Sequence, residues 1–332
     1  MSEFFRRTKA RLRPHAKVHK IPIIAHKQVE AGAIGVCVAK VAEAEVMTWG
    51  GIENVMITNQ IVTDLKIARL TNLARHCDLT VAVDDIENVR HLSRAASQRG
   101  VTLGAVIELE VGYSRGGITP GKAAIPLAEA ILTSEGLEFR GIMAFEGHAT
   151  FVPQFEVRKR LCEKSMQAVI ETKDILEDAG IGVSTVSVGG TGTYNISGLY
   201  PGVTDVRAGS YAVMDVAYRR IGIDFDCALS VLSTVTSRPA DDRAIIDAGL
   251  KSLPTDRGLP EIDLPGATLT TLTAEHGHLE LKGTSMGLRI GDLVEVLPSN
   301  VETTMNLFDQ LYATRGDEVE AIWQIPGRGK ST

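Results

Sequence analysis

The sequence predicts an α/β fold: a (β/α)8 TIM-type barrel followed by a C-terminal antiparallel β domain. From residue 11 to about residue 210, short β-rich runs alternate with longer amphipathic stretches. Eight such runs occur, the number that closes a barrel of parallel strands. After about residue 225, apolar and polar residues alternate between Gly, Pro and Asp turns, which is typical of antiparallel strands. We therefore expect a barrel over residues 1–225 and a β domain over residues 226–332.

The barrel strands are expected, in chain order, at residues 11–17, 35–39, 55–58, 79–83, 103–112, 141–147, 184–190 and 204–210. Between them lie stretches with apolar residues three and four positions apart, such as 41–50 and 86–100, which indicate helices. In the second part, strands are expected within residues 227–238, 243–250, 268–281 and 292–299. Residues 252–267 are rich in Pro, Gly and Asp and predict a loop.

Composition excludes several classes of protein. The 332 residues are 44% hydrophobic and 23% charged with a net charge of −6, so nothing global favours binding to nucleic acid or an anionic membrane. No apolar run approaches the roughly 20 residues of a membrane span, and the N-terminus has no signal-peptide core. The four cysteines have no paired metal-ligand spacing, which favours free thiols. We expect a cytoplasmic protein.

Lys17 ends the first expected strand, and barrel enzymes carry their chemistry at the carboxyl ends of strands. A desolvated lysine close to other cations loses affinity for its proton and becomes a nucleophile or an imine-forming amine. Its setting is the basic stretch RLRPHAKVHK (11–20), with His15 and His19 expected on the face of Lys17 or just beyond its end. The alternative is an exposed lysine in a basic loop, and this stretch alone leaves both open.

Small and hydroxyl residues follow the seventh and eighth expected strands. Such loops let backbone N–H groups approach an anion, and barrels often bind phosphate at these two strands. The alternative is a pair of ordinary turns. The candidate phosphate-binding residues are Gly190, Thr191, Gly192, Thr193 and Tyr194 in the first loop and Gly209, Ser210 and Tyr211 in the second.

Arg115 and Gln60 follow the fifth and third expected strands and are candidates to contact a bound cofactor ring, or else are surface residues. A reactive amine on the first strand, opposite a phosphate site on strands seven and eight, suits a phosphorylated aldehyde. Pyridoxal 5'-phosphate has this chemistry, with an imine at one end and a phosphate at the other.

Eight motifs then occur in a fixed order: PHAKVHK (14–20), AKVAEAE (39–45), TNQIV (58–62), EVGYSRGG (110–117), GGTGTY (189–194), RAGSY (207–211), IDAGLKSL (246–253) and AEHG (274–277). Together they resemble the D-threonine aldolase and D-serine dehydratase family, a branch of the alanine-racemase fold among pyridoxal-phosphate enzymes. The resemblance covers about residues 11–312. It implies that Lys17 forms the imine with the cofactor. It also implies that the protein is a homodimer and that its active site lies near the junction of the two domains.

The resemblance also implies roles for individual residues. Thr193, Gly209 and Ser210 would help to hold the phosphate, and Arg115 and Gln60 would contact the cofactor ring. The sequence departs from the family at three points. Phe145 replaces an expected tyrosine, Phe151 stands where aldolases often have a second histidine, and the usual metal pair, a His followed two residues later by Asp or Cys, is here Asn300 and Glu302. His148 remains.

Oxygen donors such as those of Asn300 and Glu302 suit a hard ion, Mg²⁺ or Mn²⁺. The alternative is a metal-free site in which Glu302 is a general base or a recognition carboxylate. His276 and His278 could add ligands, although a half-exposed strand pair is the commoner arrangement.

The resemblance implies a lyase with Lys17, His148 and Glu302 as candidate catalytic residues. We expect it to cleave a small β-hydroxy D-amino acid into glycine and an aldehyde. Dehydration or racemisation through the same lysine is the first alternative. A non-catalytic cofactor carrier and a degenerate relative without turnover are the others, and the β domain argues against the carrier.

Overall fold

The computed structural model describes all residues, 1–332, which its contacts divide into two compact units. The first unit comprises residues 1–209 together with 329–332, and the second comprises residues 210–328. The sequence placed the boundary at residue 225, and residues 210–225 group by their contacts with the β domain.

The first unit is built on an eight-stranded parallel sheet in the order β1-β8-β7-β6-β5-β4-β3-β2. A parallel bridge between His15 and Cys37, which belongs to β2, brings the segment after β1 back to the other edge and closes the barrel. All eight predicted barrel strands are confirmed, although the first and the last are two residues long. The strands are β1 (Arg11–Leu12), β2 (Val36–Val38), β3 (Asn54–Gln60), β4 (Asp78–Val83), β5 (Leu103–Leu109), β6 (Leu137–Ala144), β7 (Thr185–Val188) and β8 (Asp205–Val206).

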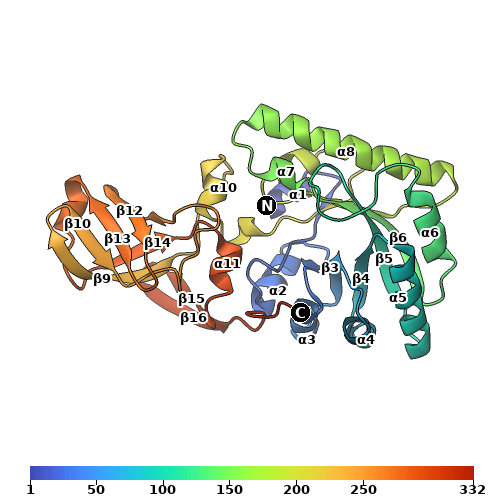
Figure 1. The fold of residues 1–332 in the computed structure, drawn as a ribbon, viewed down its shortest axis with the longest axis horizontal. Helices are drawn as coiled ribbons and strands as arrows, with labels where there is room; N and C mark the ends of the chain where they lie inside the picture. Colours follow the sequence, from blue (N-terminus) through green and yellow to red (C-terminus); the bar gives the residue numbers. More distant parts are fainter. The chain divides into compact units, whose positions relative to one another are not determined.

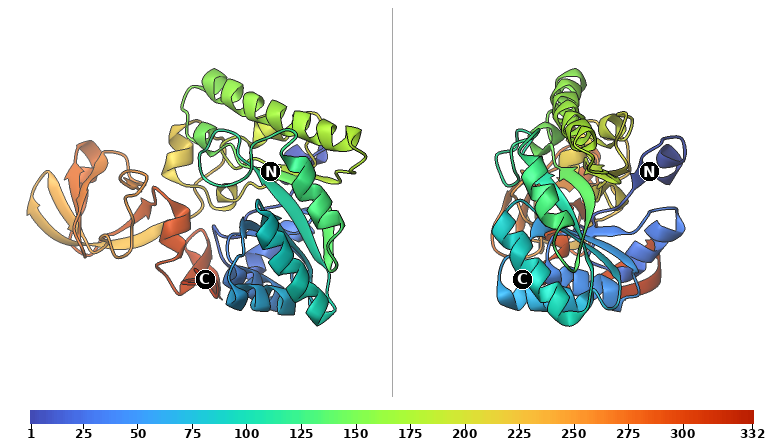
Figure 2. Two further views of the ribbon diagram at one scale, coloured as in Figure 1. Left: turned by 45° about the vertical axis from the view of Figure 1, so that its right-hand side comes forward. Right: turned by 90° about the vertical axis from the view of Figure 1, so that its right-hand side faces the viewer.

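Helices lie on the outside of this sheet (Figure 1, Figure 2). Local sequence signals set their ends: Asp85 caps α5 by accepting a hydrogen bond from the Asn88 N–H, and Gly100 ends the same helix in a left-handed conformation. The helices of this unit are α1 (Ser2–Arg6), α2 (Pro22–Glu30), α3 (Val41–Trp49), α4 (Asp64–Leu73), α5 (Ile86–Arg99), α6 (Ala124–Leu132), α7 (Gly147–Thr150), α8 (Phe155–Asp178) and α9 (Tyr194–Ser197).

The interior of the barrel is a packed core. Every residue of β2 and β5 is buried, as expected for strands covered on both faces. One buried cluster joins residues of five successive strands and fills the space that they enclose: Cys37, Met56, Ala82, Val106 and Met143. Chemistry is therefore confined to the ends of the strands.

The second unit is mainly antiparallel, as predicted. It contains a six-stranded sheet in the order β11-β14-β9-β10-β13-β12 and a separate two-stranded sheet of β15 and β16. Its elements are η1 (Ser210–Ala212), α10 (Val216–Arg220), β9 (Val231–Ala240), β10 (Arg243–Ile246), β11 (Glu261–Ile262), β12 (Ala267–Leu272), β13 (Gly277–Leu281), η2 (Gly283–Gly287), β14 (Leu293–Leu297), α11 (Val301–Met305), β15 (Gln310–Arg315) and β16 (Glu318–Gln324).

The six-stranded sheet has a core of its own, which includes Val235, Ile246, Leu253, Leu279 and Val296. The two-stranded sheet differs, because most of its residues are exposed.

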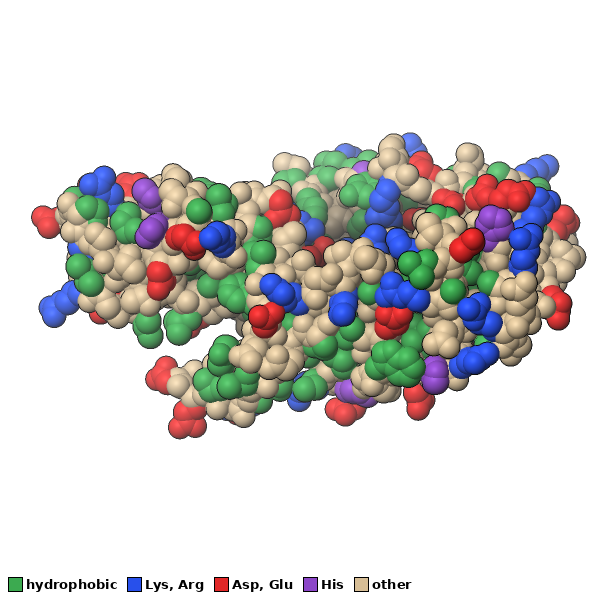
Figure 3. Space-filling model, turned by 60° about the horizontal axis from the view of Figure 1, so that its bottom comes forward, with side chains coloured by type: hydrophobic (Ala, Val, Ile, Leu, Met, Phe, Trp, Pro, Cys, Tyr) green, Lys and Arg blue, Asp and Glu red, His purple; other side chains and the backbone are tan.

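The surface carries charges of both signs. On the face shown in Figure 3, Lys and Arg are interspersed with Asp and Glu. No helix combines the length and the apolar character needed to cross a membrane.

Candidate active site

Lys17 lies in a turn directly after the first barrel strand, so the expectation that it ends this strand was wrong in detail. β1 ends at Leu12, and the bridge at His15 continues it only briefly. The backbone is nevertheless held at this point, because the Ala16 N–H donates to the Cys37 carbonyl (2.7 Å) and the Lys20 N–H to the Ala16 carbonyl (2.7 Å). Lys17 is half-buried at the carboxyl end of the barrel.

His15 is held neutral beside Lys17. Burial is the largest cause of its strongly lowered pKa, followed by the positive charges of Lys17, Arg207 and Arg115. Its Nε2 lies 3.2 Å from the Thr58 hydroxyl, which itself donates to the Val38 carbonyl (3.2 Å). Since that hydroxyl has one proton, Nε2 must be the donor to Thr58. The proton-free Nδ1 is buried without a hydrogen-bond partner in the chain.

His19 lies beyond the end of the first strand, which is the second of the two placements expected for it. The turn buries it completely, where it accepts from the Ile21 N–H (3.1 Å) and contacts the Gln28 amide (3.2 Å). Burial lowers its pKa to about 4. Nearby, Lys20 is buried in an ion pair with Glu43 (2.9 Å). His19 and Lys20 therefore help to hold the turn.

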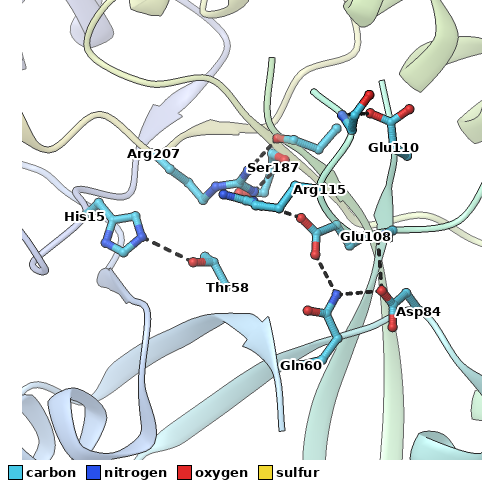
Figure 4. A network of polar contacts seen from close by, with 12 residues as sticks. His15, Thr58, Gln60, Asp84, Glu108, Glu110, Arg115, Ser187 and Arg207 are labelled. Atoms are coloured by element: carbon cyan, nitrogen blue, oxygen red, sulfur yellow. Dashed lines mark hydrogen bonds and ion pairs between the residues drawn. The ribbon is translucent and has the colours of Figure 1, made fainter. Parts of the chain in front are cut away.

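Gln60 and Arg115 are brought together by a buried acid that the sequence analysis missed (Figure 4). One oxygen of Glu108 accepts from the Arg115 guanidinium (3.1 Å), and the other accepts from the Gln60 amide (2.6 Å). The same amide donates to Asp84 (3.0 Å), which also accepts from the Gly117 N–H (3.0 Å). The ends of β3, β4 and β5 thus share one hydrogen-bond network.

Arg115 packs against two aromatic rings, with its guanidinium carbon 5.4 Å from the ring centre of Tyr113 and 5.6 Å from that of Phe145. These rings meet edge to face at 5.5 Å. Phe145, which replaces the expected tyrosine, therefore packs beside the guanidinium and orients it.

The glycine-rich loop after β7 is anchored by a second missed acid, Glu146, which is fully buried. Its carboxylate accepts from the Thr193 hydroxyl (2.6 Å) and the Gly189 N–H (3.3 Å). The Thr193 hydroxyl, expected to hold a phosphate, therefore bonds the protein itself. In this loop the N–H groups of Gly190 and Thr193 are also used internally, whereas that of Gly192 makes no hydrogen bond within the chain.

Two glycines at these loops are required by close backbone contacts. A Cβ on Gly192 would lie 2.2 Å from the Thr150 carbonyl oxygen, and one on Gly209 would lie 2.7 Å from that of His15. Gly209 therefore lets the chain after β8 approach the turn that carries Lys17.

The other predicted members of the two loops lie as follows. Thr191 is buried, and a Cβ on Gly190 would meet the Phe145 ring at 3.2 Å. Tyr194 packs edge to face on Phe4 of α1 at 5.0 Å.

Two predicted residues after β8 belong to the second unit. Ser210 hydrogen bonds Tyr218, and Tyr211 lies 5.9 Å from the Phe225 ring. Both side chains thus contact their own unit.

Arg207, which is buried directly after β8, is another residue that the sequence analysis missed. Its guanidinium donates to the backbone carbonyls of Ser187 (2.7 Å) and Ala144. It also contributes to lowering the His15 pKa, so the neutral His15 lies near three cations, Lys17, Arg115 and Arg207.

His148 lies in α7, and its ring is close to Gly112, where a Cβ would come within 3.0 Å of it. Its Nδ1 is buried without a hydrogen-bond partner in the chain. His148 also contributes to lowering the pKa of Glu110, after the hydrogen bonds from the Ser114 and Gly112 N–H groups.

Simple signals could have revealed the missed residues. Asp84 directly follows a predicted strand, and Glu108 interrupts an apolar run in which a charge needs a partner. Glu146 and Arg207 follow β6 and β8, at the strand ends where barrel enzymes carry their functional side chains.

Asn300 and Glu302 lie in the second unit, in a network of their own. The Asn300 side-chain oxygen caps α11 by accepting from the Glu302 N–H (3.1 Å), and its amide nitrogen donates to Asp256 (2.6 Å). The Arg257 guanidinium lies 3.8 Å from Glu302 and 3.6 Å from Asp215. Asp215 is fully buried, and burial raises its pKa to about 6.

This arrangement does not fit a divalent cation. Asn300 is used at both ends of its amide, and the Glu302 carboxylate faces a guanidinium. No group of three or more His, Cys, Asp or Glu side chains is placed to hold a metal ion. His276 is exposed and His278 half-exposed, the commoner arrangement considered for this pair. The four cysteines are free, and burial raises the pKa of each thiol.

Two family models match this chain, one in each of its two parts. The alanine racemase N-terminal domain matches residues 1–216, and a putative serine dehydratase domain matches residues 228–314. The chain belongs to the alanine racemase N-terminal domain family. The resemblance to D-threonine aldolases and D-serine dehydratases is confirmed by the relatives within this family.

The chain is 37% identical over 328 residues to a D-threonine aldolase of Arthrobacter sp, covering 96% of this chain and 86% of that protein. It is 34% identical over 345 residues to a 3-hydroxy-D-aspartate aldolase of Paracoccus denitrificans (strain Pd 1222), covering 99% and 88%. The crystal structure of D-threonine aldolase from Filomicrobium marinum superimposes with a TM-score of 0.97 at 36% identity, over 100% of this chain and 92% of that one.

Proposed function

We propose that this protein is a pyridoxal-phosphate-dependent lyase that cleaves β-hydroxy D-amino acids between Cα and Cβ, giving glycine and an aldehyde. The relatives named D-threonine aldolase and 3-hydroxy-D-aspartate aldolase support this reaction. The observation that carries it in the structure is the position of Lys17 in the turn after β1, at the end of the barrel where Gln60, Glu108 and Arg115 share one hydrogen-bond network.

The first unit fits the cofactor that is expected for this family. Lys17 offers a half-buried amine, and the Gly192 N–H and the loop after β8 offer donors suited to a phosphate. His15 Nδ1 has no hydrogen-bond partner in the chain and Arg115 is held by Glu108, and we propose that these two groups would contact the ring. When bound, pyridoxal phosphate supplies an electron sink for the carbanion left at Cα.

The residues of the chain then have two tasks. Lys17 would hold the cofactor through its amine. A base must remove the proton of the β-hydroxyl as the Cα–Cβ bond breaks, and we propose His148 or Glu302 for this step. His148, which belongs to the first unit, has a buried Nδ1 without a hydrogen-bond partner in the chain, and this favours His148 over Glu302 as the base. A drop in kcat with an altered pH profile in only one of His148→Asn and Glu302→Gln would assign the base.

We propose that no divalent cation takes part, because the donors at Asn300 and Glu302 do not suit Mg²⁺ or Mn²⁺. We also propose a homodimer. The two-stranded sheet leaves Tyr312, Val319 and Ile322 each 55% exposed, and such a ribbon is marginally stable in water unless it is covered. Sedimentation equilibrium of the purified protein measures this directly.

The function is tested by product analysis with D-threonine and 3-hydroxy-D-aspartate. Glycine and the matching aldehyde are expected from the D-substrate, and none from the L-enantiomer. An oxo acid with ammonia would assign a dehydratase, and the enantiomer of the substrate would assign a racemase. Absence of turnover after loading with pyridoxal phosphate would contradict the proposal.

A further inference from the structure

Arg257 occupies the charged centre of the second unit's network. Its guanidinium reaches two carboxylates, those of Asp215 (3.6 Å) and Glu302 (3.8 Å), and its carbon lies 5.9 Å from the Tyr218 ring centre. These partners come from three separate segments: Asp215 precedes α10, Arg257 lies in a loop, and Glu302 belongs to α11. The side chain of Arg257 is 24% exposed and that of Asp215 is fully buried.

A tight turn presents Arg257 at this place. The Gly258 N–H donates to the Thr255 carbonyl (3.0 Å), and Gly258 takes a left-handed conformation with φ +92°. Asp256 of the same turn accepts from the Asn300 amide (2.6 Å) and the Thr303 hydroxyl (3.1 Å). The start of α11 therefore anchors the turn, and the turn sets the direction of Arg257.

The same contacts explain Asn300. Its oxygen caps the helix and its nitrogen holds the turn, so one amide serves both the helix and the cation-bearing loop. A neutral histidine also has one acceptor and one donor, but they lie on separate nitrogens of a rigid ring rather than on the two arms of one amide carbon. Asn300, which replaces the histidine of the family's metal pair, thus holds the turn that carries Arg257.

We infer that Arg257 is a built-in cation in place of the divalent metal, and that it excludes this metal by charge. The guanidinium gives the Asp215 and Glu302 carboxylates their counter-charge, and a second cation between them would be repelled at short range. The inference rests on the proposed function in one respect: the family of the proposed lyase is what leads us to expect a divalent metal here. It states that the protein binds no Mn²⁺ at this cluster while Arg257 is present.

The test is Mn²⁺ binding to the full-length protein, followed by electron paramagnetic resonance of the free ion and by metal analysis after gel filtration. It needs no substrate and no turnover, so failure of the lyase assignment does not affect the result. The wild-type protein is expected to bind no stoichiometric Mn²⁺. One retained equivalent would overturn the inference.

Two variants separate charge from shape. Arg257→Gln removes the charge and is expected to bind Mn²⁺ about tenfold or more tightly than the wild type, because two carboxylates lose their counter-ion. Arg257→Lys keeps the charge and is expected to exclude Mn²⁺ like the wild type. A folded Arg257→Gln that gains no affinity would overturn the inference, and so would an Arg257→Lys that gains as much.

Lys251→Gln is the matched control, because it removes a cation from an exposed pair with Glu275 in the same unit. It is expected to leave Mn²⁺ binding unchanged. An equal gain in Mn²⁺ affinity in this control would show that any carboxylate without its counter-ion can bind Mn²⁺. That result would also overturn the assignment to Arg257. If Arg257→Gln does not fold, stoichiometric Mn²⁺ retained by the wild type would still overturn the inference.

Discussion

The polar side chains of the first unit lie at the ends of successive strands, whereas those around Arg257 in the second unit come from segments far apart in the sequence. In the barrel, parallel pairing alone brings Gln60, Asp84 and Glu108 to one edge. Around Arg257, a turn and a helix cap must first form. In the barrel, the repeated backbone geometry is enough to position the polar side chains, and their positions can be predicted. In the loops, specific hydrogen bonds are needed to position them.

The largest effect is expected at Lys17, the centre of the barrel cluster. Lys17→Ala should lower kcat about 10³-fold or more, because the amine that holds the cofactor is lost. The visible absorbance band of the loaded protein should disappear, together with the cofactor-modified peptide after borohydride reduction. Lys9→Ala, an exposed lysine, is the control. Cofactor trapped on another lysine would contradict the assignment.

The next effect concerns stability in acid. Burial holds the pKa of His19 at about 4 in the folded protein, against 6.5 when unfolded. Between these values the unfolded state binds the extra proton, so the free energy of unfolding falls as the pH is lowered from 6.5 to 4. This loss amounts to about 3 kcal/mol for the full shift. His15, whose pKa is lowered in the same direction, adds to the slope.

Urea unfolding at several pH values checks this expectation. His19→Gln should show a shallower pH dependence below pH 6.5 than the wild type, whereas the two curves should run parallel above pH 7, where both states hold a neutral side chain. Equal slopes in acid would show that His19 is protonated in the folded protein.

A smaller effect compares the helix caps of the two units. Asn300→Ala should destabilise the protein by about 2 kcal/mol, because it removes the α11 cap and the contact with Asp256. Asp85→Ala removes only the α5 cap in the barrel and should cost about 1 kcal/mol. Asn300→Ser, which keeps a capping oxygen, should lie between them. Equal losses for Asn300→Ala and Asn300→Ser, measured by urea unfolding, would mean that the cap contributes nothing.

The smallest effect is expected for the acid between Gln60 and Arg115. Glu108→Gln keeps the shape but loses the charge, and should weaken cofactor binding about tenfold by releasing Arg115. A spectroscopic titration with pyridoxal phosphate measures this. Glu110→Gln is the control, because that carboxylate accepts from the Gly112 and Ser114 N–H groups instead. A similar loss in both would mean that Glu108 does not position the arginine.

The strands of the barrel could be predicted because a buried strand and an amphipathic helix have different periods, as in residues 79–83 and 86–100. The ends of these strands in turn indicated Lys17, Gln60 and Arg115. Pairing between side chains could not be predicted, because which oxygen of Glu108 meets which partner depends on packing in three dimensions. The conformation of loops could not be predicted either. Arg257 lies in a segment that the sequence predicted only as a loop, so its contacts with Asp215 and Glu302 were not foreseen.

Closure of the barrel has a consequence for the assembly of the active enzyme. Lys17 is set by contacts of its segment with β8 on one side and β2 on the other, which join the two ends of the unit. Contacts between distant parts of a chain require the closure of a long loop, which slows folding. A chain with an open barrel lacks this arrangement, so under the proposed function cofactor capture by a newly made chain would report that its barrel has closed.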